Sequence, residues 1–246
     1  MKNTFTSPYF NEIVALLERL ETTQQATCEQ AAQHIAKCLK QDGIIHTFGC
    51  GHSASAALEP FHRSGCFAAV NAILDPGLMF QRGAQTGTNL ERQEAYSPRI
   101  LATHDLRPGD MLLVFSNSGR NPVGIDAVLY AKQKGVFTIA FTAASAHTHS
   151  PSRHSSGKLL KDVADLVIDN CVGSNETCLT LSGVGVAPLS TIAFSAVLHH
   201  IMYKAALILQ EQNVPLPVYK SSNAPGGDAH NHALEAKYKK RIKHLG

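Results

Sequence analysis

Five short apolar runs, each about the length of one β-strand, alternate with helix-like segments between residues 44 and 169. The runs are IIHTF, FAAVNAIL, MLLVF, VFTIAF and the centre of VADLVIDN, beginning at Ile44, Phe67, Met111, Val136 and Val163. Strands that are apolar on both faces and joined through helices form parallel sheets covered by helices on both sides. The sequence therefore predicts one α/β domain, a five-stranded, mostly parallel sheet in a three-layer α/β/α sandwich.

Further segments flank this core. Apolar residues recur at helical spacing from about Tyr9 to Leu39, which predicts one or two helices, and Pro188–Gln212 is a long apolar helix. We expect an N-terminal helical segment, 1–43, packed on a core of residues 44–212. A C-terminal arm, 213–246, is rich in proline and glycine at first and ends in a short basic helix.

Charge and composition exclude several classes of protein. The formal net charge is +3, and the one basic cluster, KYKKRIKHLG, lies at the C-terminus, which argues against a nucleic-acid-binding protein. No signal-peptide pattern opens the chain, and we expect no membrane span, so a cytoplasmic location is expected. Six cysteines without a CxxC pair indicate reduced thiols rather than a disulfide framework.

Two loops that follow predicted strands share one chemistry. GCGHS contains Gly51, His52 and Ser53, and SNSGRN contains Ser116, Asn117, Ser118, Gly119 and Asn121. Glycine lets the backbone approach an anion, and hydroxyl and amide donors bring no repelling charge. The loops predict a phosphate site; the alternatives are tight turns and helix caps. A dinucleotide site is disfavoured, because the third glycine of GxGxxG is missing and no acid ends the second strand.

Together with PLSTIAF at the start of the long helix, these loops resemble the SIS (sugar isomerase) domain. The resemblance implies that Ser53, Ser116, Ser118 and the pair Ser190 and Thr191 surround the phosphate of a phosphorylated sugar. Asn121 stands where many members have threonine, which is a mild departure because an amide can still donate. The resemblance covers about Ile44 to Gln212.

A narrower resemblance links HSSGKLLKDVADLVIDN and SSNAPGGDAHNHAL to the stand-alone UPF0309-type SIS proteins. It implies a protein that acts on N-acetylhexosamine phosphates or similar sugars. SIS relatives assemble through long helices, so the resemblance also implies a homodimer or homotetramer.

Sugar-phosphate isomerisation requires a base and an acid, and so does elimination of water or an ether group. Glu59, six residues after Ser53, is the first candidate for the base; a helical i,i+4 pair with Arg63 is the alternative. For His62 we favour a structural role. His230 is the second catalytic candidate, with Asp228 to orient it or to bind a sugar hydroxyl. Its GGDAHN segment is predicted to be a loop over the sugar of its own or of a neighbouring subunit, and the alternative is a flexible surface loop.

Three further acids are weaker candidates. Glu91 and Glu94 are expected on one face of a short helix at i,i+3 spacing, and we favour the interpretation that this face is exposed to solvent rather than directed at a sugar. Glu176 lies in the loop after the fifth strand. No histidine cluster has suitable partners for a metal, and we expect no cofactor. The sequence thus predicts an isomerase or a dehydratase- or etherase-type lyase acting on a hexose 6-phosphate; the alternative is a non-catalytic phosphosugar sensor.

Overall fold

The predicted five-stranded sheet is confirmed, and all of its strands are parallel. The structure is a computed structural model that describes residues 5–245; residues 1–4 and 246 of the predicted terminal segments lie outside the described residues. The strand order is β2-β1-β3-β4-β5. The strands are β1 Ile45–Gly49, β2 Val70–Ile73, β3 Met111–Phe115, β4 Phe137–Thr142 and β5 Leu166–Asp169.

The central strands coincide with the apolar runs of the sequence. Both faces of these strands are buried, so both need apolar side chains. Every residue of β1, β2 and β3 is buried. The register pairs Ile45 with Met111 and Gly49 with Phe115, so β1 and β3 end side by side. The loops that follow these two strands therefore start from the same edge of the sheet.

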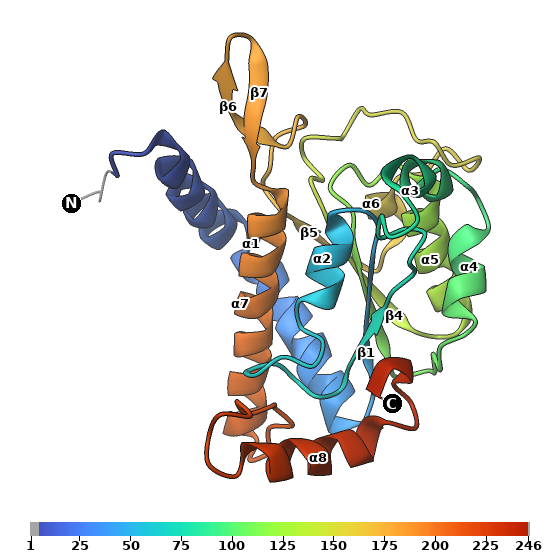
Figure 1. The fold of residues 1–246 in the computed structure, drawn as a ribbon, viewed down its shortest axis with the longest axis vertical. Coiled ribbons are helices and arrows are strands. Elements are labelled where there is room, and N and C mark those ends of the chain that lie inside the picture. Colours follow the sequence, from blue (N-terminus) through green and yellow to red (C-terminus); the bar gives the residue numbers. More distant parts are fainter. Residues whose placement is uncertain (1–4, 246) are drawn as a thin grey trace.

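Two layers of helices cover the sheet (Figure 1). On one face lie the helices α1, α2 and α7, and on the other α3, α4, α5 and α6. Their bounds are α1 Pro8–Lys40, α2 Ser53–Leu58, α3 Ala84–Glu91, α4 Tyr96–Leu101, α5 Pro122–Gln133, α6 Leu160–Val163 and α7 Ser190–Glu211. The N-terminal segment forms one continuous helix of 33 residues.

Helix α7 is long and apolar enough to cross a membrane by length and composition alone. Its inner face is buried in the core, with Phe194, Leu198 and Ile201 fully or almost fully buried. It runs beside α1 in the layer that covers the sheet. We therefore describe it as a core helix of the fold.

The β-hairpin was not predicted, and the C-terminal helix begins earlier than the short basic helix that was predicted for the end of the arm. Strands β6 Thr177–Leu181 and β7 Val184–Pro188 pair antiparallel and project from the body of the molecule beyond α7 (Figure 1). The predicted GGDAHN loop is wrong, because these residues begin helix α8, Gly227–Tyr238. The αL conformation of Gly226, with φ of 71°, lets the chain turn into this helix.

Helix α8 lies across the amino-terminal edge of the sheet, opposite the hairpin (Figure 1). A 3-10 turn, η1 Lys243–Leu245, follows it. Arg241 binds Asp110, the residue that precedes β3, and Lys237 binds Asp42, which precedes β1. The C-terminal arm is thus fixed to the edge at which the strands begin.

Candidate functional site

A cavity of about 430 Å³ opens at the carboxyl edge of the sheet. The chain places β2 on one side of β1 and β3 on the other, so the order of the strands reverses between β1 and β3. In open α/β sheets the loops diverge at such a point and leave a crevice beyond the strand ends. The residues that follow β1 and β3 line this cavity, which has the size of a small-ligand site.

The loop after β1 is shaped by its glycines. A Cβ on Gly49 would lie 2.5 Å from the backbone oxygen of Ser53, so only glycine lets α2 begin this close to the strand. Gly51 has φ of 56°, and its N–H donates to the backbone oxygen of Leu78. Gly51, His52 and Ser53, three of the residues predicted to bind phosphate, line the cavity.

The loop after β3 contributes hydroxyl and amide groups. Ser116, Asn117 and Ser118 line the cavity. The Asn117 side chain is buried, and its Oδ1 accepts a hydrogen bond of 2.6 Å from Asn170. Gly119 has φ of 60° and faces Thr142 instead, so it shapes the loop and does not line the cavity.

The third predicted contribution comes from the start of α7. Ser190, the first residue of this helix, is buried and lines the cavity. Thr191 is exposed and lies outside the lining, because neighbours on a helix point about 100° apart. Of the predicted serine–threonine pair, the structure brings only the serine to the other loops.

Basic groups that the sequence analysis missed line the same cavity. These are Arg120, His147 and Arg153, from the loops after β3 and β4. Within residues 5–245, three buried side-chain nitrogens without a hydrogen-bond partner belong to cavity residues, namely Asn117 Nδ2, Arg120 Nε and His147 Nε2. A buried polar atom without a partner costs about 1–3 kcal/mol, so these atoms indicate a polar ligand. Arg120 could have been identified from the sequence, because it lies in the serine loop directly after β3.

Two carboxylates, Glu91 and Glu176, also line the cavity. Burial raises the pKa of Glu91, although Arg92, Arg153 and a side-chain hydrogen bond from Asn121 oppose this effect. A carboxyl group whose pKa is raised toward neutrality suits proton transfer. Glu176 has φ of 61° at the base of the hairpin, and its backbone oxygen accepts from Leu189 N, next to Ser190.

Glu91 and Glu94 do not share a helical face. Helix α3 ends at Glu91, so the predicted i,i+3 relation fails before it reaches Glu94. Glu94 is exposed and accepts hydrogen bonds of 2.6 and 2.8 Å from the backbone and hydroxyl of Ser155. The interpretation that both carboxylates face solvent therefore holds only for Glu94, whereas Glu91 lines the cavity.

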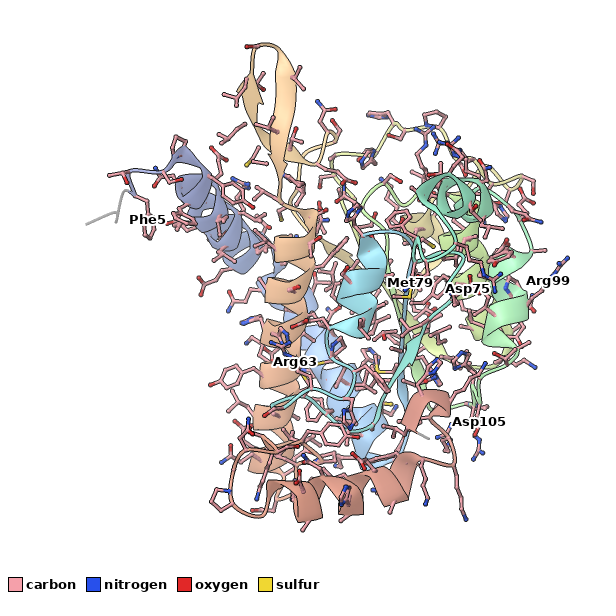
Figure 2. The ribbon with its side chains drawn as sticks, in the orientation of Figure 1. Phe5, Arg63, Asp75, Met79, Arg99 and Asp105 are labelled. Carbon is pink, nitrogen blue, oxygen red and sulfur yellow. The ribbon has the colours of Figure 1, made fainter. Side chains whose placement is uncertain are left out.

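The structure places Glu59 outside the cavity. It caps the C-terminal end of α2, where it pairs with Arg63 at 3.3 Å and with His199 of α7 at 3.1 Å. Figure 2 shows Arg63 beside α7. Helix α2 runs away from the carboxyl edge of the sheet. Glu59, the predicted catalytic base, therefore lies in the helical layer, where it pairs with Arg63 and His199. The alternative pairing with Arg63 is present, and His62 pairs with Glu235 of α8.

His230 and Asp228 also lie outside the cavity. Both are in the first turns of α8, at the opposite edge of the sheet. His230 Nε2 donates to the backbone oxygen of Val218 over 2.9 Å, and Asp228 is exposed. They therefore do not line this chain's own cavity, because the GGDAHN segment is helical and packs at the amino-terminal edge; a contribution to a neighbouring subunit's site stays a prediction.

Among the described residues, no group of three or more His, Cys, Asp or Glu side chains could hold a metal ion. The cavity thus combines serine hydroxyls, an unpartnered amide, three basic side chains and two carboxylates. Such a lining can bind an oxyanion and move a proton on the same small molecule.

Comparisons with known proteins agree on one family. The SIS domain model matches residues 8–143. A UPF0309 protein of Listeria monocytogenes is 39% identical over 240 residues, 97% of each chain, and one of Caldanaerobacter subterraneus is 39% identical over 242 residues, 96% of this chain and 98% of the relative.

Solved structures share the fold at low sequence identity. A phosphoheptose isomerase from Francisella tularensis superposes with a TM-score of 0.55 at 15% identity, covering 80% of this chain and 94% of that one. A phosphoheptose isomerase from Neisseria gonorrhoeae gives 0.51 at 19% identity, covering 81% and 95%.

Proposed function

This chain belongs to the SIS-domain family, in its UPF0309 group, and on that premise we propose that its cavity binds the phosphate of a phosphorylated sugar. The observation that carries the proposal is the convergence of Ser53, Ser116, Ser118 and Ser190 on one cavity. These residues come from three separate segments, and no acid stands among them.

The N-terminus of α5 adds to this phosphate site. The helix has 12 residues and begins at Pro122, and no side chain caps it. Its first N–H groups therefore remain available to an anion, and the helix dipole favours negative charge at this end. The unpartnered amide nitrogen of Asn117 supplies another donor beside the two serines of the same loop.

We further propose acid/base chemistry on the bound sugar, with the acid and the base supplied by the cavity's own carboxylates. Glu91 and Glu176 replace Glu59 and His230 in these roles, since only the first two line the cavity of this chain. Aldose–ketose isomerisation and elimination both start by removing the proton at C2 of the opened sugar. The residue types are compatible with either reaction. We propose that the substrate is a hexose 6-phosphate, with N-acetylated amino sugars as the leading class.

The test is incubation with hexose, hexosamine and N-acetylhexosamine 6-phosphates in deuterated water, followed by NMR. A new ketose with solvent deuterium indicates isomerisation, and an unsaturated product indicates a lyase. Binding without exchange at C2 would contradict the catalytic proposal and favour a phosphosugar sensor. Failure of every sugar phosphate to bind would contradict the proposal as a whole.

We also propose that the protein forms a homodimer or homotetramer through α1 and α7. Helix α7 is strongly apolar, yet less than half of its apolar stretch is buried within the chain. Leu17 on α1 and Tyr203 and Leu207 on α7 are exposed. Because α1 and α7 pack side by side, these exposed apolar side chains lie on one helical layer, a place where a second subunit could bury them.

A further inference from the structure

Phe80 is the one exposed large apolar side chain that lines the cavity among residues 5–245. It is 37% exposed and comes from the loop between β2 and α3. The other large apolar side chains of the lining, such as Val114 and Phe115, are buried in the core. Aromatic surface that is left in a cavity can be covered by an apolar group of a ligand, and covering it is favourable.

The backbone of Phe80 is strained. Its φ is 68°, in the left-handed region that bulky side chains rarely adopt. Backbone strain of this kind costs free energy and gathers at binding and active sites. Packing of the free protein does not account for the strain, because more than a third of the side chain remains in contact with solvent.

Two glycines and a histidine surround the ring. A Cβ on Gly51 would lie 2.9 Å from Phe80 Cζ, and a Cβ on Gly87 would lie 3.1 Å from Phe80 Cδ1. The ring thus occupies space that a larger residue at either position would fill. His52 lies edge-on to it, with ring centroids 5.5 Å apart and an interplanar angle of 63°. The ring is therefore held in place before a ligand binds.

The ring lies on the β1 and β2 side of the cavity, where it packs against Gly51 of the loop after β1. The predicted phosphate ligands Ser116, Ser118 and Asn121 line the cavity from the loop after β3. Strand β1 lies between β2 and β3, so these two strands are about 10 Å apart. A sugar whose phosphate is held by the loop after β3 can therefore extend toward Phe80.

Helix α3 brings the ring and a carboxylate to the same part of the cavity. Gly87, Thr88 and Glu91 all line it. Residues three and four apart share a helical face, so Gly87, against which the ring packs, lies on the face that carries Glu91. In an N-acylated amino sugar the acyl group is bound to the nitrogen on C2, the carbon that loses its proton. This face provides sites for both groups side by side.

We propose that Phe80 is a specificity-determining residue that binds the acyl group on the C2 nitrogen of an N-acylated amino-sugar phosphate. The inference rests on the proposed function and identifies the part of the cavity that selects the substrate. The acyl methyl group packs on the ring, and the amide beside it hydrogen-bonds with His52 and Thr88, which can both donate and accept. A hexose with a hydroxyl at C2 would bring that hydroxyl against an apolar ring, where it loses hydrogen bonds to water.

The test compares N-acetylglucosamine 6-phosphate with glucosamine 6-phosphate and glucose 6-phosphate by calorimetric titration. We expect the wild type to bind the acetylated sugar about tenfold more tightly than the other two. Phe80→Ala should weaken binding of the acetylated sugar by about tenfold and of the others by less than about threefold. An equal loss for all three would mean that the ring stacks on the sugar itself and would overturn the proposal, as would an unchanged preference.

Gly87→Ala displaces the ring without removing it, because the new Cβ would lie 3.1 Å from Phe80. Alanine favours a helix more than glycine does, so the fold should be no less stable while the preference for the acetylated sugar falls. Gln85→Ala, at an exposed position of the same helix, is the matched control and should keep the preference. Full preference in Gly87→Ala would contradict the site given to the acyl group.

Phe80→Gly separates ligand binding from a structural role. Glycine adopts a φ of 68° without strain, so we expect a urea midpoint close to that of the wild type together with loss of the preference. A clear fall of the midpoint, with an equal loss of affinity for all three sugars, would make Phe80 a packing residue and overturn the proposal. Should Phe80→Gly fail to fold, Gly87→Ala still gives the comparison.

Failure of the proposed function gives a different pattern. If Ser118→Ala binds N-acetylglucosamine 6-phosphate as tightly as the wild type, the phosphate proposal fails, whereas Phe80→Ala still reports on the acyl group. N-acetylglucosamine without a phosphate gives an independent result by saturation-transfer NMR. Transfer from the protein should reach the acetyl methyl group in the wild type and decrease in Phe80→Ala. No transfer to this methyl group in the wild type would overturn the inference alone.

Discussion

At the scale of single residues, uncharged donors rather than lysines surround the proposed phosphate. Serine hydroxyls and the Asn117 amide can each donate to a dianion without the conformational freedom of a long side chain. Asn117 Nδ2 is buried and lacks a partner, although Oδ1 of the same side chain is bound by Asn170. The amide is therefore held in place with its nitrogen left free for the proposed ligand of the cavity that it lines.

Ser118→Ala tests this arrangement at one residue. We predict a loss of affinity for glucosamine 6-phosphate of about tenfold or more, the effect of removing one hydrogen bond to a charged group. The melting temperature should stay near that of the wild type, because Ser118 is only half-buried and donates no hydrogen bond within residues 5–245. Calorimetric titration measures the affinity; an unchanged value would remove Ser118 from the site.

At the scale of elements, the site depends on the turn that joins β1 to α2. The strand ends in a glycine whose position leaves no room for a side chain, since the backbone of Ser53 folds directly over it. This tight turn is what brings the start of a helix next to the ends of β1 and β3. The site is thus a property of the junction more than of either element.

Gly49→Ala is predicted to destabilise the fold by about 1–3 kcal/mol, because the new methyl group would displace the start of α2. Phosphosugar affinity should fall with it, since Ser53 moves with the helix. The matched control is Gly173→Ala, where an added Cβ meets nothing within 4 Å and φ is not positive. Urea unfolding compares the two; equal stabilities would contradict the role of the turn.

The elements differ in how far the sequence alone predicts them. The central strands and α5 were predictable because apolar runs there end at glycine, serine or proline. The hairpin was not, since Leu181 and Val184 are exposed and its strands lack a buried face. Helix α8 was not recognised because Gly226 and Gly227 stand at its start, and paired glycines are typical of loops. The serines could be placed from the loops, whereas Glu91 and Arg153 reach the cavity only through tertiary packing.

At the scale of the whole molecule, the two edges of the sheet differ in what lies against them. The carboxyl edge carries the cavity, and the amino edge is closed by the C-terminal arm. Arg241 donates to both oxygens of Asp110 and to Asp105, which Figure 2 shows beside the C-terminal segment. Burial opposes the charge of Asp110, but hydrogen bonds from His46, Arg241 and two backbone N–H groups lower its pKa to about 2.

Arg241→Met is predicted to lower the free energy of unfolding by about 3 kcal/mol, because it leaves the Asp110 carboxylate buried without its main partner. Lys240→Met, an exposed neighbour on the same arm, should have little effect. Urea denaturation at pH 7 measures both. Equal stability of the two variants would show that the arm is not fixed by this ion pair.

Stability should also fall on acidification. Burial, followed by the charges of Lys243, His46 and His244, lowers the pKa of His104 to about 4. The unfolded chain, with a histidine pKa near 6.5, then binds more protons between about pH 6.5 and pH 4, so folding weakens as the pH falls through this window. We predict a loss of about 2–3 kcal/mol across it from His104. The slope should flatten in His104→Gln; an unchanged slope would contradict this.

Assembly is tested by a charge placed on the exposed face of α7. Tyr203 is 62% exposed on this helix, and Tyr203→Glu is predicted to dissociate the oligomer. Gln210→Glu adds the same charge at an exposed position near the end of the helix and should leave the assembly intact. Light scattering gives the masses as multiples of 26.5 kDa. A wild-type mass equal to that of a single chain would contradict the proposed assembly.

The most direct measurement is a crystal structure with glucosamine 6-phosphate or its N-acetyl derivative bound. We predict that the phosphate accepts hydrogen bonds from Ser53, Ser116, Ser118 and Ser190, with C1 and C2 directed toward Glu91. A phosphate held elsewhere, with these four hydroxyls free of it, would contradict the central claim.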